Sequence, residues 1–346
     1  NREFLVWCLS CLVLFWLSPR FQLSSSSAES ECNKRQVYTS GTTGEPKGVP
    51  LTHSQLVLAS EHIIAQVKNT SEDVELLLMP LSHSFGMGRM RTTLYAGGTL
   101  VIGYSLQRLK SVFKSIEKHK VTGLGLVPSA WNYIREMSKN LITKFSSQLK
   151  YIEFGSAYLA PEEKATLTDW FPNTNLVMHY GLTEVSRAIF TNFHTDNHHA
   201  VGKIGLGANI AIAMDNGELN QNAGEGEIVF KADWMLSKYF ENNQLTSDSF
   251  IEGYFRTGDL GKIEGDYLFL TGRLKEIINV GGKKVSPYQV EDVLNTSKLV
   301  RESVCTALAD KANGEVVQAF IVLKAEVVVE HSEIIEQLKN IISNAL

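Results

Sequence analysis

The segment from Tyr38 to Gly48 has the residue types with the clearest chemistry in this chain. It reads Tyr-Thr-Ser-Gly-Thr-Thr-Gly-Glu-Pro-Lys-Gly, so hydroxyl side chains surround two glycines and a lysine follows them. Glycines let backbone N–H groups approach a ligand closely, and successive amides in such turns form a concavity that binds anions. The hydroxyls add donors and the lysine adds a positive charge. This combination predicts a polyphosphate site, and the alternative interpretation is a polar surface turn.

The glycine segment does not follow the Walker pattern, because G-x-x-x-x-G-K-[ST] cannot be threaded through its glycines and lysine. It resembles instead the phosphate-binding signature of the adenylate-forming superfamily. That superfamily includes acyl-CoA synthetases, beetle luciferases and the adenylation domains of peptide synthetases. The resemblance implies that the segment binds the phosphates of ATP through Thr39, Ser40, Gly41, Thr42, Thr43, Gly44 and Lys47.

A second segment, Tyr180-Gly181-Leu182-Thr183-Glu184, resembles another signature of this superfamily. In the family the aromatic ring stacks on adenine, the threonine bonds the phosphate and the glutamate holds Mg²⁺. The chemistry is consistent, since Mg²⁺ prefers one or two carboxylates together with phosphate oxygens. The resemblance implies nucleotide binding by Tyr180, Gly181 and Thr183, a metal ligand at Glu184, and catalytic roles for Thr183, Glu184 and Lys47. Taken alone, five such residues could also form a helix N-terminus.

Two shorter segments resemble further parts of the same family. Residues 80–87 look like its histidine–aromatic segment at the mouth of the acyl pocket, although a loop with a hydrogen-bonded histidine also explains them. Residues 154–157 are similar to the loop that packs against adenine, where a glycine permits close approach of the backbone to a flat base. The resemblance assigns to the acyl pocket His83, Phe85 and Gly86, and to the nucleotide Gly155, Ser156 and Ala157.

Two segments toward the C-terminus extend the resemblance. The run Tyr254 to Gly261 contains Asp259, whose acceptor-only side chain would face the two ribose hydroxyls. Arg273 would contact ribose or phosphate, and Lys275 occupies the family's hinge position. In the family a small C-terminal domain swings there between adenylating and thioester-forming orientations, and a hinge needs only a few residues. Taken alone, the lysines of this region indicate a solvated basic surface.

Four other side chains allow two interpretations each. Arg187 follows the Tyr180–Glu184 segment and is either an anchor for a substrate carboxylate or a surface arginine. His194, His198 and His199 resemble a set of metal ligands, but their spacing is irregular, which favours a solvated loop.

Length and composition limit the classes of protein. With 346 residues the chain has room for two or three domains. It is 44% hydrophobic and 20% charged, which is typical of a globular protein. A net charge of −4 and a pI near 6.2 argue against a general nucleic-acid binder, which would usually show a basic surplus. We therefore expect no nucleic-acid partner.

Residues 4–17 form a nearly uninterrupted apolar run between Arg2 and Arg20. The run is short for a membrane span and close in length to a signal-peptide core. Three interpretations stay open: a sequence unrelated to the fold, a membrane anchor, or a signal peptide. An enzyme that uses ATP is expected to be intracellular and cytoplasmic, with membrane association through residues 4–17 as an additional expectation.

Short apolar segments alternate with helical ones through the first two thirds of the chain. This alternation predicts an α/β domain with a largely parallel sheet. Beyond about residue 205 the sequence pattern changes to short β segments separated by glycines. Residues 331–346 have the spacing of an amphipathic helix. The expected helices are 53–67 and 106–119, and the expected strands are 76–81, 99–102, 121–127, 151–154, 176–179, 226–231, 254–260, 266–271 and 277–280.

Together these features predict an α/β fold with a large domain of mixed and parallel sheets flanked by helices. A glycine-rich β segment belongs to that domain, and a small mobile α+β domain, incomplete in this chain, follows it. We expect residues 1–37 to be an apolar segment and serine-rich linker outside the fold, 38–272 to be the AMP-binding domain without its N-terminal part, and 273–346 to be a partial C-terminal domain. Residues 32–36 are too polar for a buried strand before the glycine segment.

The resemblance implies an acid–thiol ligase that needs ATP, Mg²⁺ and CoA. It would convert a carboxylic acid, fatty or other, to an acyl-adenylate and then to a CoA thioester. The family's second catalytic lysine stands in a Gly-Lys context that no late lysine matches, so a chain without it would adenylate slowly. Three alternatives stay open: an adenylation domain that loads a carrier protein, a luciferase-like oxygenase, and a non-catalytic nucleotide-binding fragment.

Overall fold

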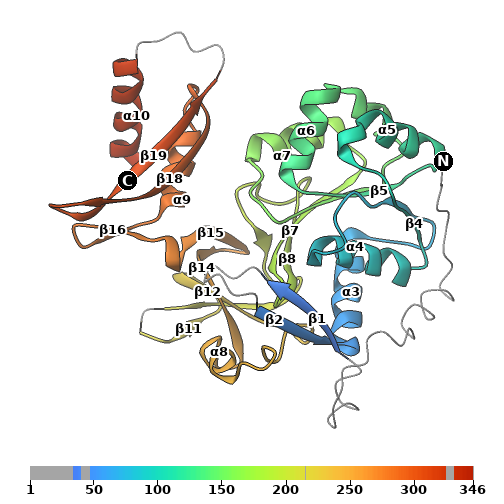
Figure 1. Cartoon of the computed structure of the whole chain (residues 1–346), viewed down its shortest axis with the longest axis horizontal. Coiled ribbons are helices and arrows are strands. Elements are labelled where there is room, and N and C mark those ends of the chain that lie inside the picture. The colour runs from blue at the N-terminus through green and yellow to red at the C-terminus, as the bar shows by residue number, and fades with distance from the viewer. Residues whose placement is uncertain (1–33, 40–46, 215, 325–330, 346) are drawn as a thin grey trace. The chain divides into compact units, whose positions relative to one another are not determined.

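The computed structural model describes residues 34–39, 47–214, 216–324 and 331–345 (Figure 1). The chain divides into two compact units. The first unit contains the described residues of 1–210, 230–255 and 266–268, and the second contains those of 211–229, 256–265 and 269–346. The chain therefore passes between the units more than once. The domain boundary expected between residues 272 and 273 stays a prediction.

A six-stranded sheet forms the centre of the first unit, with the strand order β4-β3-β5-β6-β7-β8. Every neighbouring pair is parallel except β7 and β8, which are antiparallel. The alternation of apolar and helical segments therefore predicted the sheet correctly. Its strands are β3 (Val74–Leu76), β4 (Thr99–Val101), β5 (Gly123–Leu126), β6 (Tyr151–Phe154), β7 (Asn175–Leu182) and β8 (Ser186–Asn192).

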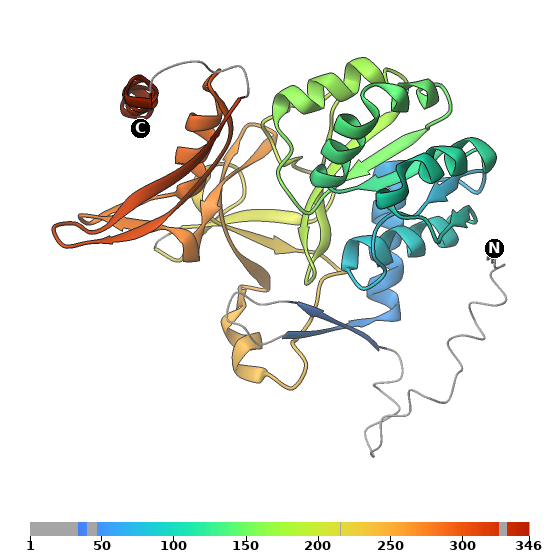
Figure 2. The ribbon, with the colours of Figure 1, turned by 45° about the horizontal axis from the view of Figure 1, so that its top comes forward.

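Helices cover both faces of this sheet. Figures 1 and 2 show α3 and α4 on one face and α5, α6 and α7 on the other. Parallel sheets covered on both faces bury their strands completely, which explains the near-continuous apolar runs in the sequence. The helices are α3 (His53–Val67), α4 (Ser84–Tyr95), α5 (Leu109–Lys118), α6 (Pro128–Ser138) and α7 (Pro161–Trp170), with 3-10 turns η2 (Leu106–Arg108) and η3 (Leu141–Phe145).

Strand β6 shows how the two faces differ. Ile152 and Phe154 belong to the larger apolar core, together with Trp131 of α6. Tyr151 points to the opposite face and packs with Ile63 of α3 in a smaller cluster. Because side chains alternate along a strand, Glu153 must also point to the face of α3 and α4. A charged residue is therefore buried on that face.

Helix α3 begins and ends where its sequence dictates. Thr52 accepts a hydrogen bond from the backbone N–H of Gln55, and the Gln55 side chain accepts one from the N–H of Thr52, which forms a capping box. The helix ends before Lys68, whose φ of 63° is left-handed. The helix spans His53–Val67, the same residues that the sequence predicted.

The prediction of a strand at residues 76–81 is wrong for all of these residues except Leu76. Strand β3 ends at Leu76, and the chain then turns toward α4. Pro80 has no backbone N–H to donate to a neighbouring strand. Its carbonyl instead accepts a hydrogen bond from the N–H of His83 at 3.3 Å, which closes a turn.

The glycine segment connects two antiparallel strands, β1 (Lys34–Thr39) and β2 (Lys47–Thr52), which form a two-stranded sheet. Strand β1 begins inside the segment expected to be a linker. A two-stranded sheet does not require an apolar strand, so the polar sequence of β1 is compatible with pairing. Residues 40–46, the middle of the glycine segment, lie outside the described residues.

The short strands and the glycine-rich β region of residues 202–273 are divided between the two units. In the first unit β9 pairs with β15 and β13 pairs with β14, both antiparallel. In the second unit β10 pairs with β11, also antiparallel. These elements are β9 (Gly202–Lys203), β10 (Asn209–Ala213), β11 (Leu219–Asn220), β12 (Gly224–Lys231), α8 (Asn243–Asp248), β13 (Phe250–Ile251), β14 (Tyr254–Glu264) and β15 (Tyr267–Arg273).

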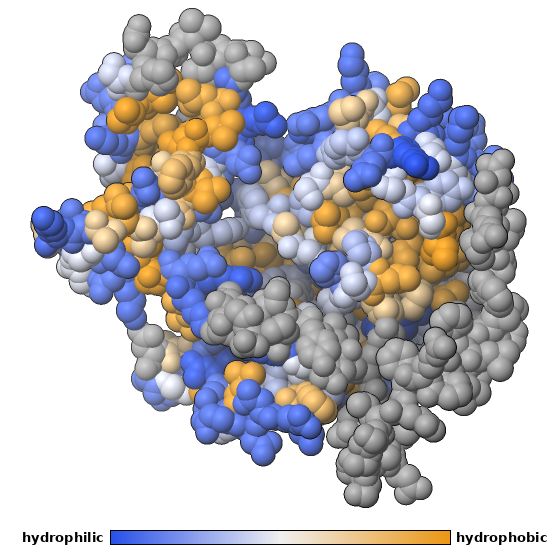
Figure 3. Space-filling view, in the orientation of Figure 1, coloured by the Kyte–Doolittle hydropathy of each residue, from blue (hydrophilic) through white to orange (hydrophobic). Residues whose placement is uncertain are grey.

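The second unit also contains a four-stranded antiparallel sheet with the order β17-β16-β19-β18. One face packs on α9 and α10 through Val290, Cys305 and Leu338. The other face exposes apolar side chains that include Val304 and Phe320, and hydrophobic residues are visible on this part of the surface in Figure 3. The elements are η4 (Leu274–Glu276), β16 (Ile278–Val280), β17 (Lys283–Val285), α9 (Pro287–Asn295), β18 (Val300–Asp310), β19 (Gly314–Leu323) and α10 (His331–Ala345).

Within the part of the chain that the structure describes, no helix combines the length and the apolar composition needed to span a membrane. The apolar run of residues 4–17 lies outside that part.

Candidate functional site

The Tyr180–Glu184 segment forms a tight corner at the end of the central sheet. Strand β7 ends at Leu182, a turn follows, and β8 begins at Ser186, with the Val185 N–H donating to the Leu182 carbonyl at 3.1 Å. A side chain at Gly181 would place its Cβ 1.8 Å from the Ser186 carbonyl oxygen, so only glycine fits there. The alternative interpretation of this segment as a helix N-terminus is wrong.

Glu184 is buried in this corner and is bound by the segment that ends near Tyr239. The Tyr239 hydroxyl donates to Glu184 Oε1 at 2.8 Å, and the N–H of Leu236 donates to the Glu184 carbonyl at 2.7 Å. The indole N–H of Trp234 donates to the carbonyl of Val185 at 2.9 Å. The residues from 234 to 239 therefore fix both the backbone and the carboxylate of the corner.

Lys47 also lies close to Tyr239. Its ammonium nitrogen is 5.8 Å from the centre of the Tyr239 ring, which is within reach of a cation–π interaction. The backbone N–H of Phe240 also donates to the carbonyl of Gly48 at 2.9 Å. Burial, and next the charge of Glu184, raise the pKa of Tyr239, so its hydroxyl stays protonated and donates. Two predicted site residues, Lys47 and Glu184, thus meet at one tyrosine.

The Gly155–Ala157 loop leaves the end of β6 beside the same corner. Gly155 is buried, and a Cβ there would lie 2.1 Å from the ring of His179, the residue before Tyr180. Ser156 has a φ of 71° and is exposed, as is Ala157. Glycine is required here by the histidine ring, a reason that the sequence did not reveal. Contact of this loop with adenine stays a prediction.

The predicted acyl-pocket residues lie at the start of α4. His83 is the N-cap residue and is exposed, whereas the side chain of Phe85 is buried. A Cβ at Gly86 would lie 2.3 Å from the carbonyl oxygen of Pro80, so this glycine lets the helix approach the preceding turn. The three residues therefore differ: His83 faces solvent, and Phe85 and Gly86 are packed inside.

His179 brings these segments together. Its ring contacts Phe85 edge-on, with 4.8 Å between the ring centres, and it also fills the space left by Gly155. The Tyr180 ring packs at 5.7 Å from that of Phe230. The structure thus joins the pocket segment, the Gly155 loop and the Tyr180–Glu184 corner around one buried histidine.

Arg187 is not a surface arginine, and that interpretation is wrong. Its side chain is 3% exposed, and its Nε donates to Glu153 Oε1 at 2.7 Å. Its guanidinium lies over the Phe85 ring, with 5.0 Å between the guanidinium carbon and the ring centre, and donates to the Phe85 carbonyl at 3.3 Å. The carboxylate that Arg187 binds is therefore an internal one.

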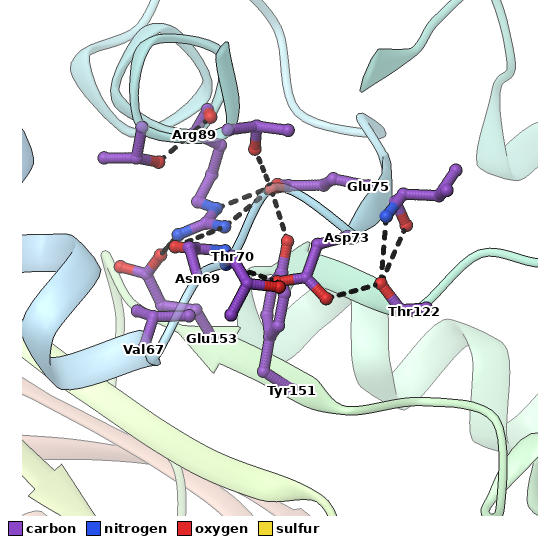
Figure 4. A network of polar contacts seen from close by, with 12 residues as sticks. Val67, Asn69, Thr70, Asp73, Glu75, Arg89, Thr122, Tyr151 and Glu153 are labelled. Atoms are coloured by element: carbon purple, nitrogen blue, oxygen red, sulfur yellow. Dashed lines mark hydrogen bonds and ion pairs between the residues drawn. The ribbon is translucent and has the colours of Figure 1, made fainter. Parts of the chain in front are cut away.

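Glu153 is also bound by Arg89, which extends the network beneath α4 (Figure 4). Arg89 donates to Glu153 at 2.8 Å and to Glu75 at 2.6 Å, and all three side chains are fully buried. Thr93 and Tyr151 donate to Glu75 as well, at 2.5 Å and 2.9 Å. Two arginines thus balance two glutamates in a region from which water is excluded.

The electrostatics of this network follow from burial and charge together. Desolvation raises the pKa of Glu153, but the charges of Arg187 and Arg89 outweigh it and hold this pKa well below its usual range. Desolvation lowers the pKa of His179, although Glu153 opposes that effect. His179 Nδ1 is 2.7 Å from Glu153 Oε1, outside the geometry of a good hydrogen bond. Glu153 is therefore ionised and His179 neutral near pH 7.

The second unit holds the remaining predicted residues. Asp259 is buried, and its Oδ1 is 2.8 Å from Nε of Arg273, whose side chain is 49% exposed. The backbone N–H of Asp259 donates to the Thr257 hydroxyl at 3.0 Å. Lys275 is exposed on the short turn η4 that follows β15. Asp259 and Arg273 thus form a pair, which neither segment alone could predict.

Most predicted residues of the glycine segment have side chains outside the described part of the chain. Ser40, Gly41, Thr42, Thr43 and Gly44 lie outside the described residues, and Thr39 is described only as the last backbone position of β1. Thr183 is half-buried in the turn beside Glu184.

Two of the three histidines in residues 194–199 contact backbone atoms through their rings. The ring nitrogens Nε2 of His194 and His198 lie 2.9 Å and 2.7 Å from the carbonyl oxygens of Thr174 and Phe193. Among the residues that the structure describes, no group of three or more histidine, cysteine, aspartate or glutamate side chains is arranged to hold a metal ion.

Sequence reasoning missed Tyr239 and the Arg89 network. A signal for the network was present, because Glu153 stands inside the expected strand 151–154 and Glu75 directly precedes the expected strand 76–81. A charge in such a segment requires a buried partner of opposite sign. For Tyr239 the sequence offered no comparable signal, because a tyrosine between lysine and phenylalanine fits many surfaces.

Comparison with known proteins gives a matching family and similar enzymes. Residues 36–240 match the family model described as AMP-binding enzyme. An oxalate–CoA ligase of Arabidopsis thaliana is 29% identical over 304 residues, which cover 86% of this chain and 59% of that protein. A long-chain-fatty-acid–CoA ligase of Mycobacterium tuberculosis is 30% identical, covering 83% of this chain and 57% of that protein.

Solved structures show the same similarity. The o-succinylbenzoate CoA synthetase of Bacillus subtilis, in complex with its acyl-adenylate intermediate, superimposes with a TM-score of 0.76 at 26% identity. The match covers 90% of this chain and 62% of the synthetase. The same synthetase in complex with ATP and a magnesium ion gives a TM-score of 0.75 at 25% identity.

This chain spans less than two thirds of the length of these relatives. The matched family model nevertheless covers more than half of the chain, and it includes the corner at Glu184 and the strand that begins at Lys47. The chain therefore belongs to the AMP-binding enzyme family.

Proposed function

We propose that this chain acts as an acid–thiol ligase, which activates a carboxylic acid with ATP and transfers the acyl group to CoA. The observation that supports this most directly is that the buried carboxylate of Glu184 and the ammonium group of Lys47 both lie next to Tyr239. The corner places an anionic and a cationic group at the end of a parallel sheet, where ligands bind in open α/β folds. The similarity to CoA ligases gives the reaction class.

The reaction has two steps. In the first, a carboxylate oxygen of the acid attacks the α-phosphorus of ATP, and the bond to pyrophosphate breaks to give an acyl-adenylate. In the second, the sulfur of CoA attacks the acyl carbon, AMP leaves, and the thiol proton passes to solvent. The first step develops negative charge on phosphate oxygens, so positioning and charge neutralisation are the main catalytic requirements.

Glu184 is suited to hold Mg²⁺ for this step. It is a carboxylate, the ligand type that Mg²⁺ prefers, and a nucleotide would bring the further oxygen ligands from its phosphates. When bound, the ion would neutralise charge on those phosphates. Thr183, next to Glu184 in the turn, would donate its hydroxyl to a phosphate oxygen, and Lys47 would add a positive charge beside the glycine segment.

In the second unit Asp259 would accept hydrogen bonds from the ribose hydroxyls. Arg273 holds Asp259 at 2.8 Å and so fixes the orientation of the acceptor. The exposed Lys275, just after Arg273, would be the hinge residue of the small domain. For the adenine we propose Tyr180 and the loop of residues 155–157.

We propose further that the acid has an uncharged acyl group. Arg187, the arginine closest in sequence to the corner, is bound to Glu153 and stacked on Phe85. A guanidinium that is already paired inside the protein does not offer a strong site to a second substrate carboxylate. Fatty and other apolar acids fit this arrangement better than dicarboxylic acids.

The test is pyrophosphate exchange into ATP by the protein, measured with a panel of fatty, aromatic and dicarboxylic acids. Exchange that depends on an apolar acid supports the proposal, and Glu184→Ala should reduce it by roughly 10²–10³-fold, as for the loss of one charge-stabilising group. ATP binding without exchange with any acid would favour a non-catalytic nucleotide-binding role. Exchange at the wild-type rate in Glu184→Ala would remove the role given to that residue.

We also propose that the reaction takes place inside the cell, where ATP is supplied. Membrane association through residues 4–17 is a separate proposal, which flotation of the intact chain with lipid vesicles would test against a chain lacking those residues.

A further inference from the structure

Tyr239 contacts the one carboxylate that the proposed function assigns to the metal. Its hydroxyl donates to Glu184 Oε1 at 2.8 Å, and both side chains are buried, with 4% of Tyr239 and 9% of Glu184 exposed. A hydrogen bond to one carboxylate oxygen fixes the rotation of the group and leaves the other oxygen, Oε2, available. Tyr239 therefore determines which way Glu184 presents its second oxygen.

The tyrosine is itself held at both ends of its segment. Its backbone N–H donates to the Thr246 hydroxyl at 3.0 Å. On its two sides, Leu236 donates to the Glu184 carbonyl and Phe240 donates to the Gly48 carbonyl. The segment 236–240 thus bridges the corner and the strand that leaves the glycine segment, so Tyr239 has little freedom to move away from Glu184.

The partner of Glu184 is neutral, and this distinguishes it from the other buried carboxylates of the first unit. Glu75 and Glu153 are paired with arginines. Within the described part of the chain, Glu184 has no cationic side chain at ion-pair distance, and its carboxylate is bound by the Tyr239 hydroxyl. A neutral donor orients a carboxylate without cancelling its charge, and that charge is what attracts a divalent cation.

We infer that Tyr239 is a positioning residue for Mg²⁺–ATP: it orients Glu184 for the metal while leaving the negative charge of that carboxylate uncompensated. The inference rests on the proposed function, which gives Glu184 its role. The same ring also faces the Lys47 ammonium at 5.8 Å. Tyr239 thus links the metal ligand to the lysine that follows the glycine segment.

The experiment is calorimetric titration of the chain with ATP, with and without Mg²⁺, in wild type and Tyr239→Phe. The substitution removes one hydroxyl and keeps the ring over Lys47. Loss of a group that orients a metal ligand typically costs 10–100-fold in metal affinity. We therefore expect Tyr239→Phe to raise the Mg²⁺ concentration needed for tight ATP binding by about 10-fold, while binding of ATP without Mg²⁺ stays unchanged.

Tyr254→Phe is the matched control. Tyr254 is buried to a similar extent, at 8% exposed, and its ring also faces a lysine, with Lys231 Nζ at 5.6 Å. This control should show the wild-type Mg²⁺ dependence. If the Mg²⁺ concentration needed for tight ATP binding rises equally in Tyr239→Phe and Tyr254→Phe, the cause is a general packing effect, and the inference is overturned.

A double-mutant cycle with Glu184→Gln distinguishes a positioning role of Tyr239 from a purely structural one. In the Glu184→Gln background Tyr239→Phe should have no further effect on Mg²⁺ dependence, because the charge that it orients is gone. If Tyr239→Phe lowers thermal stability but leaves Mg²⁺ dependence unchanged, the role is structural only and the inference fails. If wild type gains nothing from Mg²⁺, the metal role of Glu184 fails and the inference fails with it.

Discussion

Two buried glutamates in the first unit, Glu153 and Glu184, have opposite electrostatic surroundings. Glu153 lies between two arginines, Arg89 and Arg187, and its side chain is fully buried. Glu184 lies at a corner of the same sheet and is bound by the neutral hydroxyl of Tyr239. One carboxylate is neutralised by its neighbours and the other is only oriented by them.

This difference indicates that Glu153 has a structural role, whereas Glu184 belongs to the candidate functional site. Taking a charge out of water is costly, and the interior tolerates it where an opposite charge and hydrogen bonds compensate. The Arg89 network meets that condition, and it links α4 to strands β3 and β6. At Glu184 the compensation is incomplete, which is expected where the missing charge arrives with a ligand. Removing charges from the two places should therefore have very different effects on stability.

The largest effect is expected from Arg89→Met. The substitution leaves Glu75 and Glu153 buried with less compensation, and breaking a buried ion pair on one side typically costs about 3–5 kcal/mol. Urea unfolding at pH 7 measures the change in the free energy of unfolding. Arg135→Met is the control, because the Arg135–Glu163 pair is partly exposed, at 34% and 20%, and should cost about 1 kcal/mol or less. Equal losses in the two variants would contradict the distinction.

A smaller and pH-dependent effect is expected from Glu153→Gln. The folded protein holds the pKa of Glu153 well below its ordinary value of 4.5. A lowered pKa contributes stability above pH 4.5, and that contribution disappears as the pH falls toward the folded-state pKa. At pH 7 the variant should be less stable by about 2–3 kcal/mol, a typical loss for a charged hydrogen bond.

The sign of the pH dependence provides the check. Unfolding curves of wild type and Glu153→Gln, recorded between pH 7 and pH 3, should converge as the pH falls below about 4.5. A difference in stability that stays constant down to pH 3 would show that Glu153 acts through packing and not through its charge.

Much of the fold could be predicted from periodicity alone. Helix α3 and strand β6 have the residues that the sequence indicated, because apolar residues at helical spacing mark the first and a short apolar run marks the second. The prediction failed at residues 77–81, which are apolar enough for a strand but contain Pro80 and fold into a turn. Apolar composition indicates burial, and it does not by itself indicate pairing.

The candidate site was predictable only as separate segments. The motifs pointed to Lys47 and Glu184, but what joins them is Tyr239, which comes from a distant segment without a motif. For Arg187 the sequence left open a substrate anchor and a surface residue, and its actual role was missed for a related reason: its partner, Glu153, lies 34 residues away in the chain, on β6. Contacts between segments depend on the order of the strands, and a single sequence does not contain that order explicitly.

The smallest effect on stability is expected from Glu184→Gln. The amide oxygen of glutamine can still accept the Tyr239 hydrogen bond, and the substitution removes a buried charge that no arginine or lysine compensates in the described residues. The free energy of unfolding should therefore change by less than about 1 kcal/mol, or even rise, since functional groups are often retained at a cost to stability. Urea unfolding at pH 7 beside Glu153→Gln measures this.

The same variant should lose the gain in ATP affinity that Mg²⁺ provides, because the neutral amide cannot replace a carboxylate ligand. The two glutamine variants should therefore have opposite effects: Glu153→Gln loses stability, and Glu184→Gln loses the Mg²⁺ dependence of ATP binding. If Glu184→Gln instead destabilises the protein by as much as Glu153→Gln, Glu184 is a structural charge like Glu153. The contrast between an oriented and a neutralised carboxylate would then be wrong.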